Sequence, residues 1–184
     1  MDAPFDPVEL LQESGEDDYI GEPVSQLEHA LQCAALAVDA GASDALVAAA
    51  LFHDIGHLCA GDDDEVMPGL GVVRHEHLGA EFLARAGYPD AVCELVRGHV
   101  EAKRYLVATK PGYAERLSTA SQGTLALQGG ALTAEEVERF AADPLGRDKL
   151  RLRVFDERAK ETDARVPGLD HYTELLARVR SETT

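Results

Sequence analysis

Histidine and aspartate side chains that could bind a metal ion lie in several segments of the sequence, and one of these segments is strongly apolar. His53, Asp54 and His57 fall within the run AAALFHDIGHL, residues 48–58. Burying an ionised carboxylate without a partner costs several kcal/mol or forces its pKa to shift. A metal ion or a salt bridge would offset this cost, and the third explanation is that the run is not a buried helix.

Further candidate ligands lie on other predicted helices. His29 has mostly apolar neighbours, and His99 lies near the middle of the helical segment LVRGHVEAK. Metal centres inside helical bundles are built from side chains that facing helices direct inward. A second carboxylate is needed, and Asp156 is the best candidate; its alternative is an exposed acid that pairs with Arg153 or Lys160. Imidazole and carboxylate ligands suit iron, manganese or zinc.

Capping signals indicate that the elements around these residues are helices. Ser25 with Glu28 and Thr133 with Glu136 form capping-box patterns, and Gly41 follows a helix end. β-Branched runs are scarce, so we expect an all-α fold, a helical bundle around the metal site. The predicted helical segments are residues 25–41, 43–58, 76–87, 89–108, 133–143, 147–160 and 169–181, with a loop at 61–73.

Composition indicates one globular domain with an acidic surface. The chain has 184 residues, 45% of them hydrophobic, and no linker divides it, so we expect a single domain over 1–184 with its core at 25–160. The net charge of −17 argues against duplex DNA and anionic membranes as partners. No secretory signal or membrane span is visible, which favours a cytoplasmic location. We expect a monomer or a homodimer.

The three cysteines show no metal-binding or disulfide pattern. Cys33, Cys59 and Cys93 are widely spaced, and no C-x-x-C pair is present. Each has apolar neighbours, so we interpret them as inert buried thiols in a reducing compartment. No thiolate is expected among the metal ligands, which makes a structural zinc site the less favoured choice.

The order of the candidate ligands resembles a known signature. His29, then the His53–Asp54 pair, then Asp156 is similar to the H…HD…D pattern of the HD-domain superfamily of metal-dependent proteins, over residues 29–156. The resemblance implies that Asp54 bridges two metal ions when two are bound. His29, His53 and Asp156 would complete one metal site with Asp54.

Two more histidines suit a dinuclear centre of this kind. His75 and His99 would bind the second metal with Asp54, although His77 competes with His75. We favour His75 because its spacing to Gly79, H-x-x-x-G-A, resembles the third histidine of the family. A pair of metals does not decide the chemistry, since some HD hydrolases also hold two.

The segment DDYIGEPVSQLEHALQ, residues 17–32, is similar to the HD-domain mixed-valent diiron oxygenases that cleave organophosphonates. In that group the matching tyrosine, here Tyr19, occupies the open coordination position of one iron until substrate arrives. The matching glutamate, here Glu22, lies against the amine end of the substrate. The plainer interpretation of the motif is a packing tyrosine followed by a surface acid.

Other residues continue this resemblance as candidate substrate contacts. His57 lies one predicted helical turn after His53, so it can project into the site without binding metal. Lys103 lies one turn after His99, and Arg153 precedes Asp156 by three residues. Both would bring cationic donors to a phosphonate, although each would more often be solvated surface. The hydroxyls of Ser121 and Thr124 would contact the same oxygens.

The resemblance implies an Fe(II)/Fe(III) pair with O2 as co-substrate. The substrate would be a small 1-hydroxyalkylphosphonate, either 2-amino-1-hydroxyethylphosphonate or its N-methylated analogue, and the products phosphate and a carboxylic acid. A C–P bond resists hydrolysis, so a redox metal is needed. The alternatives are an HD phosphohydrolase acting on a nucleotide or phosphomonoester, a regulatory HD domain without chemistry, and an inositol-oxygenase-like enzyme.

Overall fold

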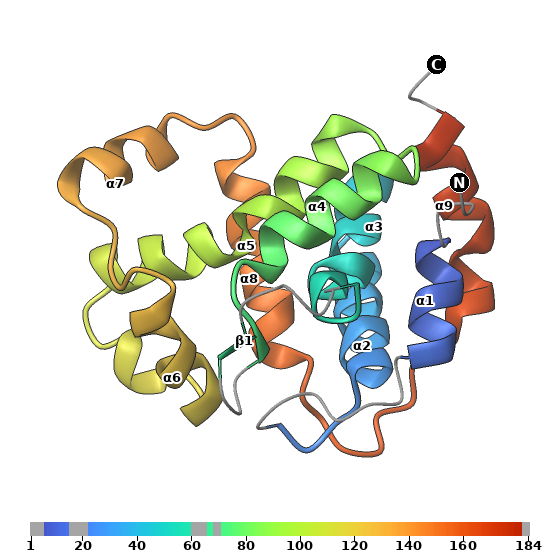
Figure 1. The fold of residues 1–184 in the computed structure, drawn as a ribbon, viewed down its shortest axis with the longest axis horizontal. Helices are drawn as coiled ribbons and strands as arrows, with labels where there is room; N and C mark the ends of the chain where they lie inside the picture. Colours follow the sequence, from blue (N-terminus) through green and yellow to red (C-terminus); the bar gives the residue numbers. More distant parts are fainter. Residues whose placement is uncertain (1–5, 15–21, 60–65, 68–70, 182–184) are drawn as a thin grey trace.

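The computed structural model describes residues 6–14, 22–59, 66–67 and 71–181, and these residues are mainly helical (Figure 1). The α-helices are α1 (Pro7–Ser14), α2 (Gln26–Asp39), α3 (Asp44–Phe52), α4 (His75–Arg85), α5 (Asp90–Thr109), α6 (Thr119–Leu127), α7 (Ala134–Ala141), α8 (Gly146–Arg158) and α9 (Thr173–Ser181). Short 3-10 helices span Ile55–His57, Ala114–Arg116 and Leu169–Tyr172. The predicted all-α fold is confirmed.

The two helix starts predicted from capping boxes agree with the structure because capping is a local interaction, whereas the helix predicted from residue 169 begins as a 3-10 helix and α9 starts at Thr173. Ser25 and Thr133 each accept a hydrogen bond from the third residue of the following helix, and that residue's carboxylate accepts one from the cap backbone. Gly41 and Gly87 follow their helices with φ of +61° and +85°, a conformation that favours glycine.

The predicted helix over residues 43–58 is wrong at its end. α3 stops at Phe52, and a 3-10 helix begins at Ile55, so the His53–Asp54 pair lies between two helices. The break brings Gly56 against the first turn of α4. A Cβ on Gly56 would lie 1.9 Å from the carbonyl oxygen of His75 and 2.9 Å from the backbone nitrogen of Gly79. We expected His57 to lie one α-helical turn after His53, and this prediction is wrong because the α-helix ends before both residues.

Other elements differ from the sequence prediction as well. The helices α1 and α6 were not predicted. Within the predicted loop 61–73, residues 61–65 and 68–70 lie outside the described residues, and β1 (Val66–Met67) pairs antiparallel with β2 (Gly71–Val72). This pairing holds Val72 beside the 3-10 helix that carries His57, where its backbone meets two histidines.

The main core lies between α2, α3, α5 and α8, with α4 packed along α5. α3 is apolar on every side, and its residues from Leu46 to Phe52 are all buried. α1 and α9 cover one flank of this core, while α6 and α7 lie at the opposite end of the molecule (Figure 1). Smaller apolar clusters around Phe140 and Tyr113 attach that end to α5 and α8.

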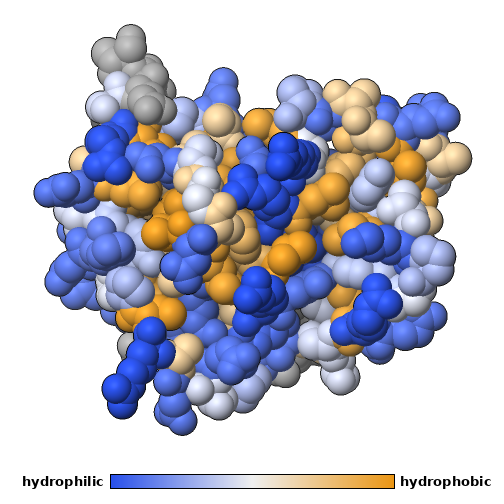
Figure 2. All heavy atoms as spheres, turned by 180° about the vertical axis from the view of Figure 1, so that it is seen from behind, coloured by the Kyte–Doolittle hydropathy of each residue, from blue (hydrophilic) through white to orange (hydrophobic). Residues whose placement is uncertain are grey.

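One face of the molecule carries both hydrophilic and apolar side chains. Hydrophilic side chains surround the apolar ones that are visible across the centre of the face in Figure 2. Within the described part of the chain, no helix combines the length and the apolarity that a membrane span requires.

Candidate metal centre

Four buried histidines share one arrangement: each donates Nδ1–H to a backbone carbonyl oxygen. The donor–acceptor distances are 2.8 Å from His29 to Ala159, 2.9 Å from His53 to Ala50, 3.3 Å from His75 to Val72 and 2.7 Å from His99 to Val96. A carbonyl oxygen only accepts, so the proton must lie on Nδ1. In the neutral ring Nε2 then carries a lone pair, which is the form that binds a metal ion.

These Nε2 atoms face one another in two pairs. The Nε2 atoms of His29 and His53 lie 3.1 Å apart, and those of His75 and His99 also lie 3.1 Å apart. When both rings of a pair are neutral in this tautomer, each Nε2 carries a lone pair and neither can donate a hydrogen bond to the other. Two ligand nitrogens at right angles around one cation, each about 2.1 Å from it, would lie about 3.0 Å apart. Each pair therefore fits the coordination of a metal ion.

The carboxylate of Asp54 lies between the two pairs and offers one oxygen to each. Its Oδ2 is 3.3 Å from Nε2 of His53 and 3.7 Å from that of His29. Its Oδ1 is 3.3 Å from Nε2 of His75 and 3.4 Å from that of His99. The break after Phe52 directs this carboxylate into the space between α2, α4 and α5, and the geometry suits a bridge between two cations.

Asp156 adds a second carboxylate to the first pair. Its Oδ1 lies 3.6 Å from Nε2 of His29, while Arg153 donates to its Oδ2. Both Asp156 and Arg153 are 4% exposed, so this is a buried pair and not the exposed surface pair that local sequence would also allow. Beside the second pair, Oε2 of Glu76 lies 3.7 Å from Nδ1 of His75, on the side of the ring away from the Nε2 that faces His99.

Burial and the neighbouring charges shift the pKa values of this site in both directions. Burial opposes the ionisation of Asp54, but His53, His75 and His99 outweigh it and hold its pKa well below the usual range. Arg153 and neighbouring histidines likewise overcome burial and lower the pKa of Asp156. Burial lowers the pKa of His29 to about 4, which keeps this ring neutral. Against the effect of burial, the carboxylate of Asp54 raises the pKa of His53 to about 9, so this ring is protonated without a metal and balances one carboxylate charge. Once that proton is released, the imidazoles and ionised carboxylates form a donor set that suits iron, manganese or zinc.

His57 differs from the other histidines in its tautomer. Its Nδ1 accepts a hydrogen bond of 3.1 Å from the backbone N–H of Val72, whose carbonyl accepts from His75. The proton of neutral His57 therefore lies on Nε2, and burial keeps the ring neutral by lowering its pKa to about 3. Although His57 lies within ligand distance of Asp54 and His75, this tautomer makes it a hydrogen-bond donor.

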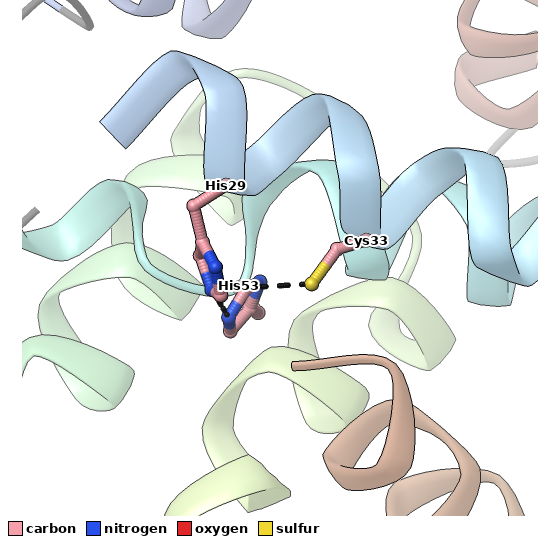
Figure 3. A group of neighbouring side chains, drawn as sticks. All are labelled: His29, Cys33 and His53. Atoms are coloured by element: carbon pink, nitrogen blue, oxygen red, sulfur yellow. Dashed lines mark hydrogen bonds between the residues drawn. The ribbon is translucent and has the colours of Figure 1, made fainter. Parts of the chain in front are cut away.

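Cys33 lies closer to the centre than we expected. It follows His29 by one turn of α2, and both side chains point from that helix toward His53 (Figure 3). The Sγ atom is 3.9 Å from Nε2 of His29. Burial, with Asp156 and Asp54 nearby, raises the pKa of this thiol well above its ordinary value, so the sulfur stays protonated beside the carboxylates.

A cavity of about 60 Å³ opens beside the second histidine pair. Its described lining consists of Glu22, Gln26, Asp54, His57, His75, His99, Val100, Lys103, Ala120, Ser121, Thr124, Gln128, Arg153, Asp156 and Lys160. The predicted substrate contacts that the structure describes are all in this set. Tyr19 lies outside the described residues.

The three cations of the cavity already have partners. Lys103 is buried and donates to Oγ1 of Thr124 at 3.0 Å. Burial, helped by Arg153, lowers its pKa to about 8. Arg153 donates through Nε to Tyr113 and to Glu157, besides its bond to Asp156. Lys160 donates to Oε1 of Glu22 at 2.5 Å.

Comparisons with known proteins agree with this architecture. The model of the HD domain family matches residues 27–148, about two thirds of the chain. This chain belongs to the HD-domain family. The matched segment carries the paired helices α2 to α5 and ends before Asp156, so that residue is assigned here from the structure and the sequence pattern alone.

Three relatives of this HD-domain protein match it over most of their own length. [1-Hydroxy-2-(trimethylamino)ethyl]phosphonate dioxygenase (glycine-betaine-forming) of Leisingera caerulea is 39% identical over 92% of this chain and 86% of its own. Hydroxymethylphosphonate dioxygenase of Gimesia maris is 41% identical over 89% and 81%, respectively. An uncharacterized protein of Acanthamoeba polyphaga mimivirus is 37% identical over 96% and 81%. The resemblance to the organophosphonate-cleaving HD oxygenases is thus confirmed.

The structure separates the histidines of this HD-domain protein clearly. His77, which competed with His75 in the sequence, has a 37% exposed side chain, and its Nδ1 accepts from Arg97 at 3.2 Å, away from Asp54. His171 is exposed on the last 3-10 helix. Neither lies beside the centre.

Sequence reasoning missed three polar residues that line the cavity, Gln26, Gln128 and Lys160. Gln26 is the first residue of α2 and shares a face with His29 at i, i+3, which could have indicated it. Lys160 follows Asp156 by four residues, but α8 ends at Arg158, so helical spacing does not place its side chain. Gln128 caps α6, a helix that was not predicted.

Proposed function

We propose that this protein is a diiron dioxygenase that cleaves the C–P bond of a small 1-hydroxyalkylphosphonate and releases phosphate and a carboxylic acid. The observation that carries the proposal is the carboxylate of Asp54 between two pairs of histidines whose lone pairs converge. The names of two relatives, both phosphonate dioxygenases, support the chemistry. The candidate substrates are hydroxymethylphosphonate, 2-amino-1-hydroxyethylphosphonate and its trimethylated analogue.

The residues available for two metal ions divide into two sets. His29, His53 and Asp156 would hold one iron together with Oδ2 of Asp54. His75 and His99 would hold the other with Oδ1 of Asp54. The bound iron pair would supply the redox chemistry that a hydrolysis-resistant C–P bond requires, with O2 as co-substrate. Tyr19 as a displaceable ligand remains a prediction from sequence.

The chain's own residues would bind and orient the phosphonate in the cavity. Lys103 and Thr124 form one polar group on facing helices, 3.0 Å apart, and Ser121 lies one turn before Thr124. Lys103 would give a charge-assisted hydrogen bond to a phosphonate oxygen. His57 would donate Nε2–H to the substrate without binding metal, because Val72 holds its proton on that nitrogen.

The sequence predicted Arg153 as a direct phosphonate contact, but we propose that it mainly positions Asp156. Its guanidinium already donates to Asp156, Tyr113 and Glu157. Its main role would be to fix the Asp156 carboxylate and keep it ionised, which the lowered pKa of Asp156 supports. Its positive charge would also favour a phosphonate in the cavity that it lines.

The experiment loads the protein anaerobically with Fe(II), oxidises it partly, records its EPR spectrum and measures phosphate release from the three phosphonates with and without oxygen. We expect two irons per chain, the spectrum of a mixed-valent pair and phosphate release that requires O2. Asp54→Asn is the matched control, because it keeps the shape of the side chain but removes the negative charge between the two histidine pairs. Oxygen-independent release of phosphate from a nucleotide or phosphomonoester, with none from phosphonates, would make the protein an HD phosphohydrolase.

A further inference from the structure

A partly buried ion pair that the metal site does not use lies in the same cavity. Nζ of Lys160 donates to Oε1 of Glu22 at 2.5 Å, and the two residues are 138 positions apart in the sequence. Their side chains are only 17% and 10% exposed. Lys160 also reaches Oγ of Ser118, the N-cap of α6, at 3.4 Å. The pair therefore connects the segment before α2 to the end of α8 and to α6.

The charges around the cavity make Glu22 the carboxylate that a cationic substrate would need. Of the described acids that line the cavity, Asp54 and Asp156 face the histidines. Among these three acids, Glu22 is the one whose described ion pair is with a lysine and not with a histidine, so its carboxylate is the one that could face a substrate ammonium. The ammonium of Lys160 already takes that place.

A substrate ammonium would have to displace Lys160 from Glu22. Lys160, which is partly buried, would lose a charge-assisted hydrogen bond, and two cations beside one carboxylate repel each other. A trimethylammonium could not replace the lost hydrogen bond, because it has no N–H donor, and such cations are bound by aromatic faces. Among the described residues that line the cavity there is no phenylalanine or tyrosine.

We propose that Lys160 is a specificity-determining residue whose ion pair with Glu22 selects phosphonates without an ammonium group, so that the preferred substrate is an uncharged 1-hydroxyalkylphosphonate such as hydroxymethylphosphonate. This inference rests on the proposed function and narrows its substrate class. Lys160 takes no part in the metal site. It completes the charge balance of Glu22 and leaves Lys103 and the metal ions to bind the anionic end.

The test compares hydroxymethylphosphonate with 2-amino-1-hydroxyethylphosphonate on the iron-loaded enzyme, as kcat/KM from oxygen-dependent phosphate release. We expect the wild-type protein to favour hydroxymethylphosphonate by roughly tenfold or more. Lys160→Met removes the cation but keeps a chain of similar length, and the preference should fall or invert because the amine can then pair with Glu22. Lys160→Arg should keep the wild-type preference, and the exposed Lys110→Met is the surface control.

A double variant separates selectivity from general damage. Adding Glu22→Gln to Lys160→Met should abolish the gain for the amine, since no carboxylate remains to receive it. A wild-type preference for the amine would overturn the proposal. An equal loss for both substrates in Lys160→Met would also overturn it, because the lysine would then serve only the structure.

Calorimetric binding under anaerobic conditions distinguishes this proposal from the proposed function. Without turnover, the wild-type protein should bind hydroxymethylphosphonate more tightly than 2-amino-1-hydroxyethylphosphonate. This difference in affinity should fall or invert in Lys160→Met. If no phosphonate releases phosphate but the binding ratio changes as expected, the C–P cleavage is wrong and the selectivity stands. If neither phosphonate binds the iron-loaded protein, both are wrong.

Discussion

The imidazole rings of His57 and His75 stack with their centroids 4.0 Å apart and their planes 20° from parallel. Val72 gives these neighbours opposite roles, because its N–H donates to Nδ1 of His57 and its C=O accepts from Nδ1 of His75. One ring therefore presents a lone pair to the centre and the other presents an N–H. The backbone of one short strand thus makes His75 a candidate metal ligand and His57 a candidate substrate contact.

Replacing each of these rings should have a different effect on metal content. His75→Ala should lower iron from two to one per chain, whereas His57→Phe should retain both irons and raise KM for the phosphonate. Loss of one hydrogen bond to a charged group, about 1.5–3 kcal/mol, corresponds to roughly a tenfold to hundredfold weaker interaction. Atomic absorption and steady-state kinetics measure the two effects. Iron loss in His57→Phe equal to that in His75→Ala would make His57 a ligand.

The bridging position of Asp54 predicts a loss that no other carboxylate variant should share. Asp54→Ala removes an oxygen from both histidine pairs, so both metals should be lost, while Asp156→Ala should lose only the metal beside His29. Metal analysis after gel filtration gives the stoichiometry, and circular dichroism controls for folding. Retention of one metal by Asp54→Ala would contradict the shared bridge.

The phosphonate affinity should weaken above pH 8 because of Lys103. Burial lowers the pKa of this lysine from 10.5 to about 8, so its charge is present below pH 8 and is lost as pH rises through that value. KM for the phosphonate should therefore rise above pH 8. Lys103→Arg, which keeps its charge at all these pH values, should move this rise to higher pH. An unchanged profile in that variant would assign the titration to another group.

A methyl group at Gly56 should destabilise the fold strongly. The added Cβ would lie 1.9 Å from the carbonyl oxygen of His75, and the backbone of α4 to which this atom belongs cannot move away easily. We expect Gly56→Ala to lower stability by roughly 3 kcal/mol, a decrease in Tm of roughly 10 °C. Gly168→Ala is the control, since nothing lies within 4 Å of its Cβ and its φ is −78°. Thermal denaturation of both variants checks the difference.

The resemblance at the N-terminal motif yields a prediction that stands on sequence alone. Tyr19→Phe should keep both irons, because the phenol is expected to occupy only an exchangeable position, but it should alter the response to substrate or oxygen. EPR of the iron-loaded variant before and after substrate, and kcat/KM at several oxygen concentrations, measure this. Wild-type behaviour with every substrate would remove the gating role.

Local patterns in the sequence predicted the helical class and the main candidate ligands. A capping box joins residues three positions apart, and a helix-ending glycine needs only its own φ, so Ser25, Thr133 and Gly41 could be identified without tertiary information. The HD pair and the spacing of His29, His75 and Asp156 belong to the same kind of evidence. They depend on residue type and order, which the sequence states directly.

Contacts between distant segments decided the rest. The backbone of Gly56 against α4 ends α3 early and turns Asp54 between the histidine pairs, and no signal within residues 43–58 encodes that contact. Burial made Arg153–Asp156 an internal pair where helical spacing also allowed a surface one. Likewise, only the folded chain brings Lys160 to Glu22, because the desolvated pairing of charges 138 residues apart depends on how whole helices pack.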